Sequence, residues 1–167
     1  MKLLVGREKQ DQAVVEKNVV GGGVLIMKRQ DKYPETKWFI YDNVNPKNRI
    51  TGDCVIRALT GAFQAVGMPV DYEYTLRQLV EVSIGTGYSV CSKECIERYL
   101  KPNYDKQKQP RKADNTKYTG KEFCEKFSKG VYICFIGGHH VTVVIDGKIH
   151  DIWDCSNKTI GNYWKIG

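Results

Sequence analysis

The sequence predicts an α+β fold, in which an early helical layer packs on an antiparallel sheet from the C-terminal part of the chain. Apolar residues recur at helical spacing over residues 53–66, whereas β-prone runs dominate residues 131–153. Asp146 and Gly147 separate two of these runs and form the strongest short signal for a hairpin. Since the helices precede these strands instead of alternating with them, we expect the two kinds of element to form separate layers.

The composition is that of a globular protein, and we expect one domain over residues 1–167. Its hydrophobic fraction of 41% and its charged fraction of 27% are ordinary for that class. No apolar run approaches the ~20 residues that a membrane helix needs, and no secretory signal follows Met1, so we expect a cytoplasmic protein without a membrane partner. In that compartment the six cysteines are expected to be free thiols.

Strands and an arm are expected over residues 1–40. Valine-rich runs flank Gly21 to Gly23, a pattern typical of a β-hairpin with a glycine turn. A phosphate-binding loop is the alternative for these glycines, but no Lys followed by Ser or Thr comes after them. A further β-prone run covers residues 37–41, and an Asn-rich loop leads from it into the central helix.

Four helices are expected, over residues 53–66, 71–82, 93–100 and 119–127. In the first, Val55, Leu59 and Phe63 recur at helical spacing and give one buried stripe. In the last, Thr119 and Glu122 match the capping box, in which each side chain accepts a hydrogen bond from the backbone of the other residue.

Residues 101–118 are polar, basic and poor in apolar side chains, which predicts an exposed basic loop. Together with Tyr99, Tyr104 and Tyr118 this stretch can follow a nucleic-acid backbone, so nucleic acid is an alternative partner. The net charge of +7 also suits an acidic peptide or protein substrate.

The turn at Asp146 and Gly147 fixes which side chains of the late hairpin share a face. With a two-residue turn, the alternation of side chains puts His140, Asp151 and Trp153 on the same face. His140 and Asp151 are then diagonal neighbours within reach of a hydrogen bond. Trp153 on that face can shield the pair from water, which would strengthen it.

The opposite face of the same hairpin carries a second pairing, His139 with Asp154, and the sequence leaves this alternative open.

Cys54 stands at or near the start of the central helix, where Thr51 and Asp53 are both candidate caps. Unpaired N–H groups at a helix start favour thiolate over thiol, whose free pKa is about 8.5. An imidazole held by a carboxylate, and facing such a thiol, forms the general arrangement of nucleophile, base and orienting group. We therefore expect Cys54 as nucleophile, His140 as base and Asp151 as orienting group.

A cysteine that opens the central helix, followed much later by a histidine on one strand and a carboxylate on the next, resembles the papain-like cysteine peptidase superfamily over residues 40–165. The stretch from Gly52 to Leu59 is similar to the nucleophile motif of ovarian-tumour-type deubiquitinases. Residues 45–54 and 140–154 look like small uncharacterised papain-like proteins of phages and their hosts.

The resemblance implies a papain-like fold and an oxyanion hole. In papain-like enzymes an amide side chain six residues before the cysteine helps to form this hole, and Asn48 stands at that offset from Cys54. The backbone N–H of Cys54 would supply the other donor. The Gly-Ser-Cys-Trp signature of papain is missing, and the amide side chain belongs to Asn rather than Gln.

The resemblance also implies a function, that of a hydrolase of the thiol protease type. Its substrate would be a peptide or protein, cleaved at a peptide, isopeptide or related amide bond by the catalytic triad without a cofactor. If the chain is phage-encoded, the compartment is the host cytoplasm. A cysteine acyltransferase of the transglutaminase type is the alternative enzyme, and a non-catalytic basic binding protein in phage–host contact is the alternative outside catalysis.

No metal site is expected from the sequence. Structural zinc sites bring together two tight pairs of ligands, whereas Cys91 and Cys95 form one loose pair.

Overall fold

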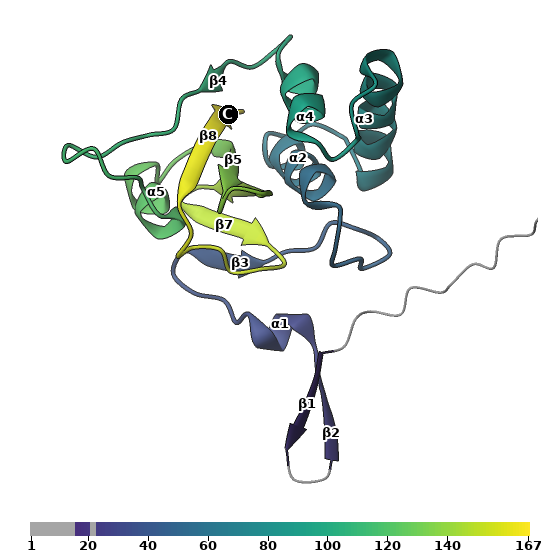
Figure 1. Ribbon diagram of the computed structural model, residues 1–167, viewed down its shortest axis with the longest axis vertical. Helices are drawn as coiled ribbons and strands as arrows, with labels where there is room; N and C mark the ends of the chain where they lie inside the picture. The colour runs from purple at the N-terminus through teal and green to yellow at the C-terminus, as the bar shows by residue number, and fades with distance from the viewer. Residues whose placement is uncertain (1–15, 21–22) are drawn as a thin grey trace, which may run out of the picture.

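Figure 1 shows the computed structural model, which describes residues 16–20 and 23–167. The elements in chain order are β1 (Glu16–Val20), β2 (Gly23–Met27), α1 (Arg29–Lys32), β3 (Phe39–Tyr41), α2 (Cys54–Ala65), α3 (Tyr72–Thr86), α4 (Lys93–Leu100), β4 (Lys106–Gln107), α5 (Gly120–Lys126), β5 (Val131–Ile136), β6 (His140–Ile145), β7 (Lys148–Asp151) and β8 (Ile160–Lys165). Most of the expected glycine turn, and the arm before residue 16, lie outside the described residues.

The expected N-terminal hairpin is present as a small sheet of its own. Strands β1 and β2 pair antiparallel, with Val20 opposite Gly23, and neither joins the larger sheet. In Figure 1 this hairpin projects away from the body formed by the later elements.

The larger sheet has six strands in the order β3-β7-β6-β5-β8-β4, and the α+β prediction is confirmed at this level. All its pairs are antiparallel except β3 with β7, which are parallel. The turn at Asp146 and Gly147 has positive φ at both residues, as a two-residue hairpin of type I′ requires. The predicted register is confirmed, because Val143 lies opposite His150.

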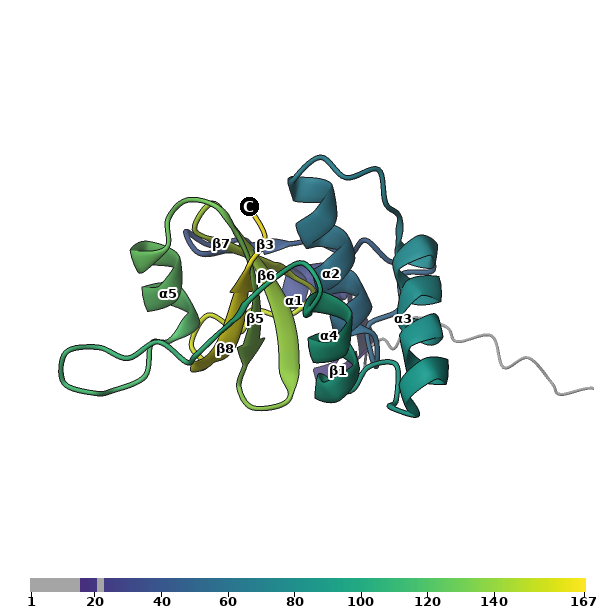
Figure 2. The same cartoon turned by 90° about the horizontal axis from the view of Figure 1, so that it is seen from above.

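Helices cover both faces of the larger sheet, which corrects the expectation of a single helical layer. Figure 2 shows α5 on one side of the strands and α2, α3 and α4 on the other. Strand β5 explains this arrangement, since its side chains are buried on both faces. Val131 and Ile133 join the core under α2, whereas Tyr132, Cys134 and Ile136 join the core under α5.

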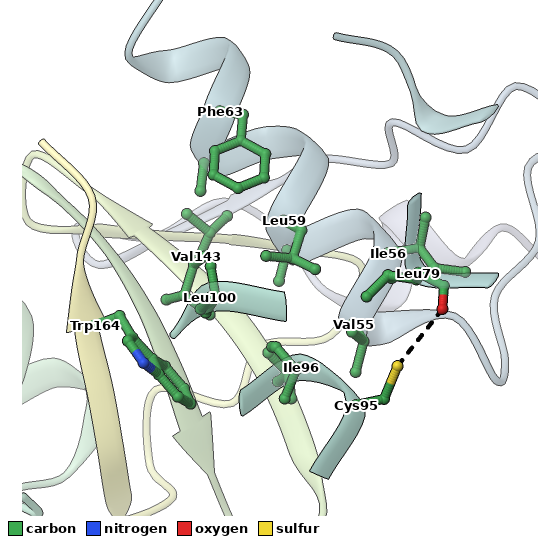
Figure 3. Packing of buried hydrophobic residues seen from close by; sticks show 14 of the residues in the cluster. Val55, Ile56, Leu59, Phe63, Leu79, Cys95, Ile96, Leu100, Val143 and Trp164 are labelled. Atoms are coloured by element: carbon green, nitrogen blue, oxygen red, sulfur yellow. Dashed lines mark hydrogen bonds between the residues drawn. The ribbon is translucent and has the colours of Figure 1, made fainter. Parts of the chain in front are cut away.

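Helix α2 lies at the centre of the first of these cores. Every residue from Val55 to Phe63 is buried. Figure 3 shows Val55, Leu59 and Phe63 of this helix beside Val143 of β6 and the α4 residues. The same view shows the thiol of Cys95 in α4 donating to the backbone carbonyl of Leu79 in α3 over 3.6 Å. The buried stripe predicted from the sequence therefore joins the helices to the sheet.

The remaining helices begin where their caps predict. Ser92 accepts from the N–H of Cys95 at the start of α4, and Thr119 and Glu122 form both hydrogen bonds of the capping box of α5. Helix α3 continues past its expected end at residue 82 and stops at Gly87, whose φ of 77° suits the left-handed end of a helix. In the part of the chain that is described, no helix combines the length and apolar character needed to cross a membrane.

Two strands differ from the expectation. Residues 101–118 are not wholly a loop, because β4 within them pairs with the end of β8 at the edge of the sheet. Strand β8 itself was not expected, although its Ile160 and Trp164 are buried. The returning strand of the hairpin ends at Asp151, two residues earlier than predicted.

Replacing Leu59 by Ala tests the central place of α2. Leu59 is fully buried, so the cavity left behind should lower the free energy of unfolding by about 2–5 kcal/mol. Urea unfolding followed by circular dichroism measures this change. The control is Ile84→Ala on α3, where the side chain is 80% exposed and the expected change is within about 0.5 kcal/mol. Equal losses of unfolding free energy in the two variants would contradict the central position of α2 in the core.

Candidate active site

Cys54 is the first residue of α2, at the place where the sequence puts it. Asp53 occupies the N-cap position, but its side chain accepts no hydrogen bond from the helix N–H groups. The carboxylate of Asp53 instead pairs with the guanidinium of Arg57, one turn along the helix. The Asp53 side chain therefore does not cap the first N–H groups of α2. These groups point toward the N-terminal end of the helix, where Cys54 lies.

The thiol of Cys54 contacts the first two residues of strand β6. It is hydrogen bonded to the imidazole of His140 and to the backbone N–H of Val141. Burial acts to raise the pKa of Cys54, but these hydrogen bonds and the positive charge of His140 outweigh it, and the pKa lies below its ordinary value. These contacts therefore favour the thiolate, paired with an imidazolium, over an isolated buried thiol.

His140 is held on its other side by Asp151, the last residue of β7. The Nε2 atom of His140 lies 2.5 Å from Oδ2 of Asp151, which leaves Nδ1 as the ring nitrogen for the thiol. Burial acts to lower the pKa of His140, whereas its hydrogen bonds with Asp151 and Cys54 raise it, and the pKa reaches about 9. The ring of Trp153 meets that of His140 edge to face, with centroids 5.1 Å apart, so the indole packs against the imidazole.

The carboxylate of Asp151 is fixed at both oxygens and is buried. While Oδ2 contacts His140, Oδ1 accepts from the backbone N–H of Ile152 over 2.7 Å and lies 3.8 Å from Nη2 of Arg57. A carboxylate held in this way has little freedom to rotate, so it orients the imidazole ring.

Arg57 links the two carboxylates of the site. Its side chain is buried and reaches Asp53 and Asp151, which lie on different elements. Asp53 also accepts from the side-chain amide of Asn45 over 2.7 Å and from the hydroxyl of Tyr72 over 3.2 Å. This network joins the loop before α2, the start of α3 and the end of β7 around the triad.

The sequence analysis did not predict that Asn45 and Tyr72 donate hydrogen bonds to Asp53. The spacing of Asp53 and Arg57, four residues apart on one helix face, was the available signal. The amide of Asn45 carries no comparable signal, because an Asn in a loop usually serves a turn.

The alternative pair from the sequence, His139 with Asp154, is not joined by a hydrogen bond or ion pair among the described residues. His139 is exposed, and Oδ1 of Asp154 accepts from the backbone N–H of Ser156 in a turn. Asp154 lies beyond the end of β7, so it falls outside the ladder that places Asp151 beside His140.

Asn48, the residue expected in the oxyanion hole, is exposed and lies in a turn. Its φ is 52°, in the left-handed region that Asn tolerates, and its N–H donates to the carbonyl of Asn45 over 2.9 Å. No hydrogen bond joins its side chain to Cys54 or His140 in the described part of the chain. Its role toward an oxyanion stays a prediction.

Three possible metal donors gather at the same place, namely His140, Asp151 and Cys155, with their ligand atoms within 4.8 Å of one another. Burial raises the pKa of Cys155 well above its ordinary range, which disfavours the thiolate that a metal requires. Since structural zinc takes four ligands, this set of three falls short of such a site. Cys91 and Cys95 donate instead to the carbonyls of Gly52 and Leu79.

An open pocket of about 660 Å³ is lined by neighbours of Cys54, whereas Cys54 itself lines a separate and much smaller cavity. Val55, which follows Cys54 in the helix, and Val141, whose N–H donates to the thiol, both line the open pocket. The open pocket therefore lies next to Cys54.

The comparisons with known proteins give no match. No model of a protein family fits the chain, and neither the curated proteins nor the solved structures contain a significant relative. The resemblance to papain-like peptidases accordingly stays an expectation from the sequence.

The pH dependence of alkylation tests the thiolate. Because the pKa of Cys54 is lowered and that of His140 is raised to about 9, the ion pair should form below the ordinary pKa of a thiol and persist up to about pH 9. Limiting iodoacetamide with peptide mapping should therefore label Cys54 selectively at pH 6. In His140→Ala the burial that raises the pKa of Cys54 remains, but the imidazole that lowers this pKa is lost. Labelling of Cys54 should therefore shift to alkaline pH. Cys91 is the internal reference, because burial raises its pKa; equal labelling of the two cysteines at pH 6 would contradict the ion pair.

A double-mutant cycle tests the bridge made by Arg57. Arg57→Met leaves the buried carboxylate of Asp53 without its counter-charge, while Asp151 keeps His140, and it should lower the free energy of unfolding by about 3–5 kcal/mol. Adding Asp53→Asn should recover part of this loss, with a coupling energy of about 0.5–3 kcal/mol in urea unfolding. Arg77→Met is the matched control, since its ion pair with Glu73 is exposed and the expected change is within about 1 kcal/mol. Strictly additive losses would show that the bridge is not formed.

Proposed function

We propose that the protein is a thiol-dependent hydrolase that cleaves a peptide, isopeptide or related amide bond. The observation that carries this proposal is one hydrogen-bonded line of Cys54, His140 and Asp151, with the thiol at a helix start. Each member has the neighbour that its role requires, since the nucleophile contacts the base and the base contacts the orienting group.

The reaction follows from these contacts. The Cys54 thiolate attacks the carbonyl carbon, and the charge that develops on the carbonyl oxygen is met by the backbone N–H of Cys54 at the start of α2. Asn48 is the candidate for a second donor to that oxygen. The imidazolium of His140 then protonates the departing amine, which releases it and leaves an acyl group on the sulfur.

Water completes the cycle. Neutral His140 takes a proton from a water molecule, and the resulting hydroxide attacks the thioester carbonyl, so that the acid is released and the thiol is restored. Asp151 stays ionised throughout and stabilises the imidazolium that forms in each half of the reaction.

The fold supports a papain-like assignment within the same proposal. A nucleophile helix packs on an antiparallel sheet, and neighbouring strands of that sheet carry the base and the orienting group. All six cysteines are free, which suits activity in a reducing compartment such as the cytoplasm.

Acylation by p-nitrophenyl acetate tests the proposal without knowledge of the substrate. At pH 6 the protein should release a burst of one nitrophenol per chain and carry one acetyl group on Cys54, located by peptide mapping. Cys54→Ala should abolish the burst, and His140→Ala should slow it by about 10²–10⁴-fold. His150→Ala is the matched control, because this histidine lies on the same hairpin but pairs with Asp42, 3.2 Å away.

The fate of the acetyl group separates the candidate activities. Its loss to water supports a hydrolase, whereas transfer to an added primary amine in preference to water would identify an acyltransferase. If Cys54 is not acetylated faster than in His140→Ala, catalysis by this triad is ruled out. Binding of an acidic partner that Cys54→Ala leaves unchanged would then favour a binding protein.

A further inference from the structure

The 660 Å³ pocket lies within reach of a substrate held at Cys54, because neighbours of Cys54 line it. Its walls come from α2, the start of α4, the turn between β5 and β6, and strand β8. Val55 follows Cys54 in α2 and the N–H of Val141 donates to the thiol, so a group attached close to the scissile carbonyl can reach this pocket. Gly137, Gly138 and Gly161 contribute no side chains, which keeps it open.

The charged groups around this pocket are all potential cations. Lys93, Lys117 and His139 line it, and no carboxylate side chain does so within the described residues. The other lining side chains are neutral, namely Val55, Cys91, Gln109, Phe135, Val141, Thr159 and Asn162. The two lysines can therefore attract an anion in this pocket, and no carboxylate of the pocket lining competes with it for them.

Lys93 is held at the pocket rather than drawn away from it. Its Nζ lies 5.5 Å from the centroid of the Phe135 ring, which itself lines the pocket. The nearest carboxylate, Glu97, is 3.9 Å from this Nζ but only 2.5 Å from Nζ of Lys106. Because Glu97 is already paired with Lys106, much of the charge on Lys93 stays available.

A neutral donor complements these cations. The N–H of Gln109 donates to Oδ1 of Asn162 over 3.0 Å, which occupies the acceptor of that amide. The NH₂ group of Asn162 is thereby left to donate, and a carboxylate can accept from it.

We propose that this pocket binds a carboxylate of the substrate next to the scissile bond, carried either by an acidic side chain or by a chain end. The assignment rests on the proposed function, because Cys54 defines what counts as the scissile bond. Lys93 and Lys117 supply the charge, and Asn162 supplies a hydrogen bond. The enzyme would therefore prefer acidic substrates because of a local site and not only because of its net charge.

Matched alkylating reagents test the pocket. We use three reagents that share the bromoacetyl group which alkylates Cys54 and differ only in the amino-acid side chain attached to it. They are the N-bromoacetyl derivatives of glutamate α-amide, glutamine α-amide and lysine α-amide. At low salt the glutamate reagent should modify Cys54 about three- to tenfold faster than the glutamine reagent, and the lysine reagent should be slowest. Bromoacetyl-glutamine with a free α-carboxylate shows whether a chain end serves as well as a side chain.

Two double variants locate the effect. Lys93→Gln with Lys117→Gln should abolish the preference for glutamate, measured as the ratio of the glutamate and glutamine rates within the same variant. Lys121→Gln with Lys148→Gln removes the same net charge from exposed residues outside the pocket and should keep the preference. Equal rates of the glutamate and glutamine reagents in the unmodified protein, or equal effects of the two double variants, would overturn the pocket proposal.

The failure of this proposal differs from that of the hydrolase. If Cys54 is acetylated by p-nitrophenyl acetate but shows no preference among the bromoacetyl reagents, the hydrolase stands without this pocket. If Cys54 is an ordinary thiol, the reagents still report its surroundings at alkaline pH, and a preference there would show an anion pocket beside a non-catalytic cysteine.

Discussion

The packing of helix α2 on strand β6 is the contact on which the site depends. Gly61 of the helix approaches the strand so closely that a Cβ atom there would lie 3.4 Å from Cγ1 of Val143. The same helix begins with Cys54, and the same strand begins with His140. The position of the thiol relative to the imidazole is therefore set by the packing of apolar side chains. The contact between the two reacting groups does not itself have to hold the helix against the strand.

Burial has two opposite effects at this site. Removal of Asp53, Asp151 and Arg57 from water is costly, and their mutual contacts together with the amide of Asn45 offset that cost. The same dry surroundings make each remaining charge interaction stronger than it would be at the surface. For Cys54 burial alone disfavours the thiolate, and the neighbouring imidazole and backbone N–H reverse the outcome. Burial of the charged groups thus both strengthens their interactions and imposes the energetic cost of removing them from water.

The parts of the structure with local signals could be predicted from the sequence. The caps at Ser92 and Thr119 act within one turn, and the two-residue turn after Ile145 fixes the register of its hairpin by geometry alone. That register was enough to predict the contact of His140 with Asp151. Strand β8 escaped because its Gly and Asn residues lower β-propensity, and only its neighbours in the sheet reveal its role. The bridge from Arg57 to the distant Asp151 depends on tertiary packing, which no spacing along the chain encodes.

The order of the elements along the chain also has a consequence for biosynthesis. The nucleophile helix is made early, whereas His140 and Asp151 belong to a hairpin near the C-terminal end. A nascent chain that has been synthesised only as far as α5 carries a thiol with neither of the β6 groups that lower its pKa. The thiol acquires its reactive form only when the last hairpin joins the sheet beneath α2. Translation therefore separates the synthesis of the nucleophile from its activation.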